Sequence, residues 1–188
     1  TCMDRNAPEG LTDTAQSGYD ASKALLNQWH GVGRAHYAIT PRFSPTSTSE
    51  HLAAMGALWA EYPDCLMQTH LSEQLDEIAW VRALFPNSRD YLDTYEIHGL
   101  LGPGGMYGHA IHLEPREIQR LREVDAALIH CPTSNTFIGS GLFATMGFCK
   151  SGQRVGLATD TGGGSSFSML RTMAAAYEVG QLRGTPLH

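Results

Sequence analysis

The sequence predicts an α/β fold of the (β/α)8 or TIM-barrel type, and because 188 residues are fewer than the roughly 250 of a complete barrel, either the fold is smaller or the chain is part of one. Short strand-like segments that are apolar on both faces alternate with amphipathic helical segments along the whole chain, which is typical of a parallel sheet with helical crossovers. A doubly wound open sheet satisfies the same pattern. The barrel is favoured because polar, metal-competent residues end several consecutive strands, whereas an open sheet collects its ligand at one switch point.

The amino-terminal third of the sequence predicts a loop, two helices and a short strand. Apolar residues recur at helical spacing between Ala15 and Trp29, and Gly31 ends that run. Serine and threonine side chains then offer a cap for the second helix, and Pro63 ends it. The expected elements are a loop over 1–11, a helix capped by Thr12 or Asp13, a strand over 36–40 that Pro41 halts, and a helix that begins at 47–49.

The rest of the sequence predicts four further strands separated by helices. In the helix over 73–84, Leu75, Ile78 and Val81 should face inward, and the last helix carries its apolar residues on one face. That face consists of Leu170, Met173, Ala174 and Tyr177. The expected elements are strands over 65–71, 106–111, 126–131 and 155–159, and helices over 73–84, 89–97, 115–123 and from Ser165 onward.

Composition and charge exclude several classes of partner. A content of 42% hydrophobic and 17% charged residues is typical of a folded, soluble domain. The net charge of −6 and the lack of a basic stripe argue against nucleic acid. No signal peptide opens the chain and no apolar segment approaches the roughly 20 residues that span a bilayer, so we expect no membrane contact and a cytoplasmic location. Because the sequence does not begin with Met, an upstream segment would change that expectation.

The four cysteines are expected to be reduced thiols. Cys2, Cys65, Cys131 and Cys149 are widely spaced, and none forms a C-x-x-C pair of the kind that binds zinc or carries out redox chemistry. Cys65 and Cys131 lie inside apolar, strand-like runs. A free cysteine in such a place behaves as a small hydrophobic residue.

Three predicted strands each present one metal-competent side chain at the carboxyl end. These side chains are His70, His109 and Asp160. In a parallel barrel such strand ends meet at one mouth, where two imidazoles and a carboxylate suit a hydrolytic metal site. A hydrogen-bonded core histidine or a turn-capping aspartate is the simpler alternative for each. A buried carboxylate nevertheless needs a cation or several donors, because burying it alone is costly.

Glu73 is a candidate proton carrier beside this set. It follows His70 by three residues on the same strand-to-helix turn, so a metal ligand and a proton-transferring group would be neighbours. The alternative is a favourable acid in the first helical turn. His112 should point away from His109 in a strand, so we expect a structural role for it. The glycine run at 162–164 lacks the spacing of a phosphate-binding loop.

Two other strand ends carry polar side chains. Arg42 and Phe43 follow the first strand, and such a pair can stack on a flat ring and hydrogen-bond its carbonyl groups. A solvent-exposed loop cation is the alternative for Arg42. The segment His130–Asn135, with the sequence HCPTSN, follows another strand. A tight turn that satisfies its own backbone explains that segment equally well.

Taken together, these segments resemble the metal-dependent amidohydrolase superfamily. The segments that carry the resemblance are, in this order, Gln68–Glu73, Tyr107–Ala110, His130–Asn135 and Ala158–Thr161. Within the superfamily, three more segments are similar to the guanine deaminase family, namely Met3–Pro8, Thr40–Ser44 and Gly139–Phe143. The resemblance covers nearly the whole chain, and its motifs are far more specific jointly than singly.

The resemblance implies a reaction and a role for each candidate residue. A metal-bound hydroxide would attack C2 of guanine, a small-molecule purine, and ammonia would leave to give xanthine. The metal would be one zinc ion, with iron as the alternative. The implied metal ligands are His70, His109 and Asp160; the catalytic residues are Glu73 and Asp160; the substrate-binding residues are Arg42, Phe43, His70 and His109.

The resemblance also implies that the sequence covers only part of the barrel. The family's first strand carries an H-x-H pair of metal ligands, and no H-x-H occurs in this sequence. The predicted strands would correspond to the fourth through the eighth, so residues 1–188 would form a partial amidohydrolase barrel domain without its N-terminal strands. Such a barrel exposes strand edges and apolar interior surface, which favours a homo-oligomer, most simply a dimer. We expect this chain alone to be poorly active.

Two alternatives to guanine deamination stay open. The same site could act on a triazine or an adenosine-type ring, although Arg42 suits a ring that bears a carbonyl group better. A partial barrel could also bind no metal and serve only as a folding or assembly unit.

Overall fold

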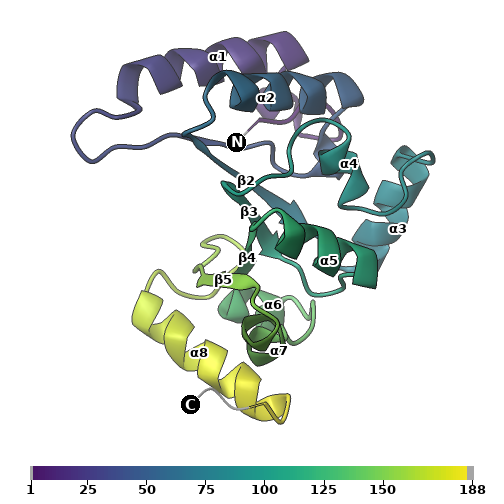
Figure 1. Cartoon of the computed structure of the whole chain (residues 1–188), viewed down its shortest axis with the longest axis vertical. Coiled ribbons are helices and arrows are strands. Elements are labelled where there is room, and N and C mark those ends of the chain that lie inside the picture. The colour runs from purple at the N-terminus through teal and green to yellow at the C-terminus, as the bar shows by residue number, and fades with distance from the viewer. Residues whose placement is uncertain (1, 186–188) are drawn as a thin grey trace. The chain divides into compact units, whose positions relative to one another are not determined.

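The computed structural model describes residues 2–185, in which five strands form one sheet in the order β1-β2-β3-β4-β5 (Figure 1). The pairs β1/β2 and β4/β5 are parallel. The strand order never reverses, as it would at the switch point of a doubly wound sheet, which confirms a partial (β/α) barrel. The strands are β1 (Ala38–Ile39), β2 (Leu66–Leu71), β3 (Gly105–His109), β4 (Ala127–His130) and β5 (Arg154–Leu157).

The chain divides into two compact units. Unit 1 comprises the residues up to 69 together with 79–106, and unit 2 comprises 70–78 together with the residues from 107 onward. The helices are α1 (Ala15–Trp29), α2 (Ser49–Glu61), α3 (Leu75–Leu84), α4 (Asp93–Glu96), α5 (Pro115–Glu123), α6 (Pro132–Phe137), α7 (Thr145–Lys150) and α8 (Met169–Leu182), with 3-10 turns at Glu9–Leu11 and Ser44–Thr46. The expectation of a single domain over 1–188 stays a prediction, and residues 1 and 186–188 lie outside the described part.

Helix α1 in unit 1 begins later than predicted. Its cap is Thr14, whose side chain accepts a hydrogen bond from the Ser17 N–H while the Ser17 hydroxyl accepts one from the Thr14 N–H. This reciprocal pair satisfies two N–H groups that the helix leaves unbonded. The expected caps are wrong because both are engaged elsewhere: Thr12 donates to the Pro8 carbonyl and Asp13 accepts from the Met3 N–H.

Helices α1 and α2 of unit 1 run side by side (Figure 1). Helix α2 is capped by Thr48, which lies within the predicted start at 47–49. The Thr48 side chain accepts a hydrogen bond from the His51 N–H. Further along, a Cβ at Gly56 would collide with the carbonyl oxygen of His98. The missing side chain therefore lets the backbone after α4 pack directly on α2.

The segment over 89–97 is less helical than its spacing predicts. Only the four-residue helix α4 forms in this segment, because backbone N–H groups at and before its start bond to side chains. The Arg89 N–H donates to Asp93 Oδ2 at 2.8 Å, and the Asp93 N–H donates to Asp90 Oδ1 at 2.9 Å. Short polar side chains thus compete with the helical hydrogen bonds. Strand β1 is likewise shorter than predicted, and beyond it Pro41 forms an isolated bridge with Cys2.

Unit 2 contains one helix with the predicted bounds and two that were not predicted. Helix α5 begins at Pro115, a residue suited to the first helical position, and ends at Glu123 as expected. Helix α6 begins at Pro132, so this segment is helical and not the tight turn that the sequence left open as an alternative. Helix α7 follows it. In β4 and β5 the parallel register pairs His130 with Leu157.

Three expectations about burial are also wrong. Strand β2 alternates between buried and exposed residues, with Leu66 at 44% exposure, rather than being buried on both faces. Leu75, the first residue of α3, is exposed. Helix α8 begins after Ser168 and packs against α6, and its buried residues include Ala176 and Val179. The apolar stripe predicted to be buried, including Leu170, is exposed. None of the helices in residues 2–185 combines the length and apolar character that a bilayer crossing requires.

Candidate metal centre

The three predicted metal ligands lie together in unit 2. His70 is near the end of β2, His109 is the last residue of β3, and Asp160 follows β5. Each residue offers one ligand atom, and these atoms lie within 4.8 Å of one another. The two imidazole rings stack with their centres 5.2 Å apart at an angle of 28°. The carboxyl ends of β2, β3 and β5 thus bring together side chains that are far apart in the sequence.

Unusual backbone conformation marks these strand ends. Among the described residues, six other than glycine have positive φ, and four of them are Ser72, His109, Ala110 and Asp160, with φ of 48°, 68°, 49° and 48°. Such a conformation costs free energy for residues with a side chain and persists where the surroundings impose it. Here the Ala110 N–H donates to the Leu71 carbonyl at 2.8 Å, which holds the turn.

The glycine run after Asp160 serves the same turn. A Cβ at Gly163 would lie 2.9 Å from both Asp160 Oδ2 and Ser134 Oγ, and one at Gly164 would collide with the Thr159 carbonyl. The glycines therefore allow the chain to fold closely around the carboxylate. This packing accounts for the run without a phosphate ligand.

Glu73 lies between these ligands and two polar side chains that sequence reasoning missed. Its Oε1 is 3.2 Å from His109 Nδ1, and it accepts hydrogen bonds from Asn135 Nδ2 at 3.1 Å and Ser140 Oγ at 3.0 Å. Glu73 precedes α3 rather than beginning it. The Glu77 carboxylate accepts the Glu73 N–H at 2.9 Å, which fixes the turn. The carboxyl group is therefore held in one place from several sides.

Burial shifts both groups of this contact toward their neutral forms. Burial, reinforced by the charges of Glu77 and Asp160, raises the pKa of Glu73 to about 7, although its hydrogen bonds oppose the rise. Burial and the neighbouring His70 lower the pKa of His109 to about 4. His109 is therefore neutral near pH 7, as a metal ligand must be. Because Nδ1 is engaged with Glu73 and Asn135, Nε2 is the nitrogen left to face a metal ion.

Asn135 was not among the predicted site residues, because a tight turn explained its segment equally well. As α6 starts directly after β4, it carries Asn135 to 3.0 Å from His109 Nδ1. The only sequence signal was its position just past a strand end, where barrel sites lie. His112 Nε2 donates a hydrogen bond to the Ser140 carbonyl at 2.9 Å, in keeping with the structural role expected for it.

Arg42 and Phe43 belong to unit 1. The Arg42 guanidinium lies 4.9 Å from the centre of the Phe43 ring, and the Arg42 carbonyl accepts a hydrogen bond from the Thr69 hydroxyl at 3.1 Å. The pair therefore stacks on itself in this structure. Its contact with a substrate stays a prediction.

Comparison with known proteins places the site in a family. The chain is 49% identical to guanine deaminase of Escherichia coli (strain K12) over 97% of its own length and 42% of that enzyme. The solved structure of E. coli guanine deaminase matches all of the chain with a TM-score of 0.97, at 48% identity and over 44% of that structure. Guanine deaminase from C. acetobutylicum, solved with guanine bound in the active site, matches 98% of the chain and 45% of its own, with a TM-score of 0.92 at 30% identity.

The chain spans less than half the length of each of these relatives. The sequence model of the amidohydrolase family matches residues 2–184, which is almost the whole chain. The chain therefore belongs to the amidohydrolase family.

Proposed function

We propose that the protein carrying this sequence deaminates guanine by hydrolysis, giving xanthine and ammonia. The likeness to guanine deaminases supports this proposal, since it extends over nearly the whole chain at high identity. The observation that carries it is the cluster of His70, His109 and Asp160 beside Glu73 in unit 2. This cluster joins a metal-competent donor set to a proton carrier, as a hydrolytic deamination requires.

One divalent cation fits the donor set of this cluster. Two imidazoles and a carboxylate within 4.8 Å of one another would hold zinc, our proposed metal, or iron. When bound, the cation would activate a water molecule for attack on a ring carbon. The stacked rings and the turn around Asp160 orient the donors, and the contact of His109 with Glu73 and Asn135 fixes the ring.

Glu73 and Asp160 would move the protons of the reaction. Asp160 would accept the proton of the attacking water, and Glu73 would give its own proton to the ring nitrogen. Glu73 would then take the proton of the new C2 hydroxyl group and pass it to the departing amine as the C2–N bond breaks, and the proton held by Asp160 would return to Glu73. The hydrogen bonds from Asn135 and Ser140 hold the Glu73 carboxyl group in position for this role. One water is consumed and one ammonia is released, so the step balances.

Arg42 and Phe43 would bind the purine ring, and His70 and His109 would border it. An arginine beside an aromatic ring suits a flat, carbonyl-bearing substrate better than one with amino groups only. Replacing Arg42 by Ala should raise the KM for guanine more than it lowers kcat. Unchanged guanine turnover in that variant would instead favour an adenosine-type or triazine ring.

The reaction is tested by following xanthine release from guanine in the purified protein, before and after chelation and with zinc or iron restored. Glu73→Gln keeps the size of the side chain and removes its proton transfer. Glu178→Gln is the matched control, since it makes the same change at an exposed position on α8. Full turnover in Glu73→Gln, or after complete metal removal, would refute the proposal.

The metal-free alternative and self-association need a separate measurement. Metal content per chain after dialysis distinguishes a stoichiometric site from a partial barrel that binds no metal. Sedimentation of the same sample reports the oligomeric state. We expect one metal ion in this centre and a homo-oligomer, with a dimer as the simplest form.

A further inference from the structure

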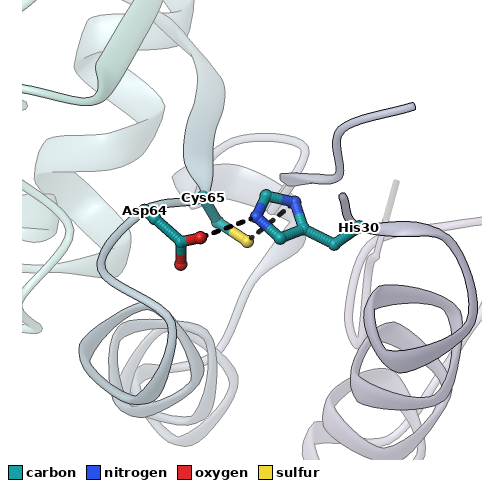
Figure 2. A group of neighbouring side chains, drawn as sticks. All are labelled: His30, Asp64 and Cys65. Atoms are coloured by element: carbon teal, nitrogen blue, oxygen red, sulfur yellow. Dashed lines mark hydrogen bonds and ion pairs between the residues drawn. The ribbon is translucent and has the colours of Figure 1, made fainter. Parts of the chain in front are cut away.

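A second cluster of metal-competent side chains lies in unit 1. It consists of His30, Asp64 and Cys65, whose ligand atoms lie within 4.8 Å of one another (Figure 2). His30 caps the carboxyl end of α1, and Asp64 and Cys65 directly precede β2. The cluster therefore joins the end of a helix to the start of a strand, and none of its members takes part in the proposed deamination.

Hydrogen bonds decide which nitrogen of His30 could meet a cation. Nε2 lies 3.0 Å from Asp64 Oδ2, so this nitrogen carries the proton and donates to the carboxylate. Nδ1 accepts the Tyr37 N–H at 3.1 Å and lies 3.6 Å from Cys65 Sγ. Figure 2 shows dashed lines from the His30 imidazole to the Asp64 carboxylate and to the Cys65 thiol. Nδ1 and the sulfur are thus the two atoms that face each other.

The separation of these two atoms suits a shared ion. Zinc binds sulfur at about 2.3 Å and imidazole nitrogen at about 2.0 Å, so tetrahedral geometry places the two ligand atoms roughly 3.5 Å apart. The distance between Sγ and Nδ1 is 3.6 Å. A carboxylate on the other ring nitrogen is the usual outer partner of a metal-bound histidine, and Asp64 takes that place.

The cysteine of this cluster is buried, whereas its aspartate lies at the surface. Cys65 is 1% exposed, and its carbonyl accepts the Trp59 indole N–H at 2.9 Å. The side chain of His30 is 12% exposed, whereas that of Asp64 is 73% exposed. The exposed ring of His36 meets the His30 ring edge-on, with centres 5.4 Å apart. A second imidazole therefore lies beside that of His30.

We propose that Cys65 Sγ and His30 Nδ1 bind a thiophilic divalent cation of the zinc class, with Asp64 orienting His30 and His36 supplying a third ligand. Binding releases one proton, from the Cys65 thiol, and the Tyr37 N–H turns from Nδ1 to the thiolate. The bound cation would cross-link the loop over 30–37 to the start of β2. This site is independent of the proposed deaminase centre, which contains no sulfur ligand.

Titration of the metal-free protein with Co²⁺ tests the proposal, because a thiolate bound to cobalt gives a charge-transfer absorption in the near ultraviolet. We expect this band to saturate at one thiolate-bound ion per chain, to disappear on addition of Zn²⁺ and to be absent in Cys65→Ala. Cys131→Ser and Cys149→Ser are matched controls that should keep it. No band in the unmodified protein, or a band that survives Cys65→Ala, would overturn the proposal.

Two further measurements separate a metal site from loss of folding. Zn²⁺ should raise the Tm of a protein whose deaminase centre carries Asp160→Ala, and should not do so once Cys65→Ala is added, while the metal-free forms of both melt cooperatively. Asp64→Asn should keep the cobalt band and weaken binding by roughly 10- to 100-fold, as loss of an outer partner does. If Zn²⁺ still raises the Tm when Cys65→Ala is present, or if Asp64→Asn leaves the affinity for Co²⁺ unchanged, the assigned site is wrong.

Discussion

The two clusters of histidine and carboxylate side chains differ in how the backbone holds them. In unit 2, His109 and Asp160 both have positive φ and sit in turns that glycines and backbone hydrogen bonds enforce. In unit 1, His30 has an ordinary extended backbone (φ −67°, ψ 123°), and Asp64 is largely exposed. Backbone strain therefore accompanies the cluster proposed for catalysis, whereas the cluster in unit 1 has the unstrained backbone expected of a structural metal site.

The largest expected effect separates the two clusters by function. Asp160→Asn should lower guanine turnover by a factor of roughly 100 or more, because it removes both a metal ligand and a proton acceptor. Cys65→Ala should leave turnover close to that of the unmodified protein. Steady-state xanthine formation measures both variants. Equal losses in the two would show that the clusters are not functionally distinct.

A pH-dependent effect should appear at His130, which the burial of unit 2 keeps neutral. Its ring stacks on Phe143 with centres 4.6 Å apart, its Nε2 has no hydrogen-bond partner among the described residues, and burial lowers its pKa to about 4 from 6.5. The unfolded chain binds this proton first, so stability is full above pH 6.5 and falls as the pH drops toward 4. The expected loss is about 3 kcal/mol.

This slope is measured by denaturant unfolding between pH 4 and pH 7. The variant His130→Gln should flatten it, whatever its stability at neutral pH. His36→Gln is the control, because it makes the same substitution at an exposed position. A slope that His130→Gln leaves intact would assign the pH dependence to other groups, such as His109.

In unit 1 the next prediction concerns close packing of the backbone at Gly56. Gly56→Ala forces a Cβ against the His98 carbonyl and should cost about 1–3 kcal/mol of unfolding free energy. Gly10→Ala is the control, because nothing lies within 4 Å of a Cβ there. Thermal unfolding of both variants measures the difference. Equal stability would mean that the backbone after α4 yields easily.

The smallest expected effect concerns strain that serves no chemistry. Asp125, just past the end of α5, has φ of 55° and makes an ion pair with Arg154 in which both side chains are more than half exposed. Asp125→Gly should stabilise the protein by about 0.5 kcal/mol, because glycine adopts this conformation freely and the exposed pair contributes little. Ser72→Gly, the same kind of change at a strand end of the proposed site, should not raise guanine turnover. A gain there would contradict the view that strain at the strand ends supports the site.

Much of the fold could be predicted from the sequence because its signals are local. Helical spacing located α2 and α5, and short apolar runs located all five strands. The prediction was wrong where side chains bond to the backbone, as at Asp93, or where contacts between helices choose the buried face, as in α8. Those outcomes depend on competing partners that spacing does not reveal.

The amino-acid sequence was enough to predict that His70, His109 and Asp160 would lie at the carboxyl ends of strands, because parallel strands present these ends at one edge of a sheet. The other contacts of the site depend on how distant segments pack. This packing brought Asn135 and Ser140 onto Glu73 across more than sixty residues of chain, and it joined His30 to Cys65 across thirty-five. Periodicity reports the neighbours of a residue along its own helix or strand. Contacts between distant segments, and the burial that shifts a pKa, arise only when those segments pack together.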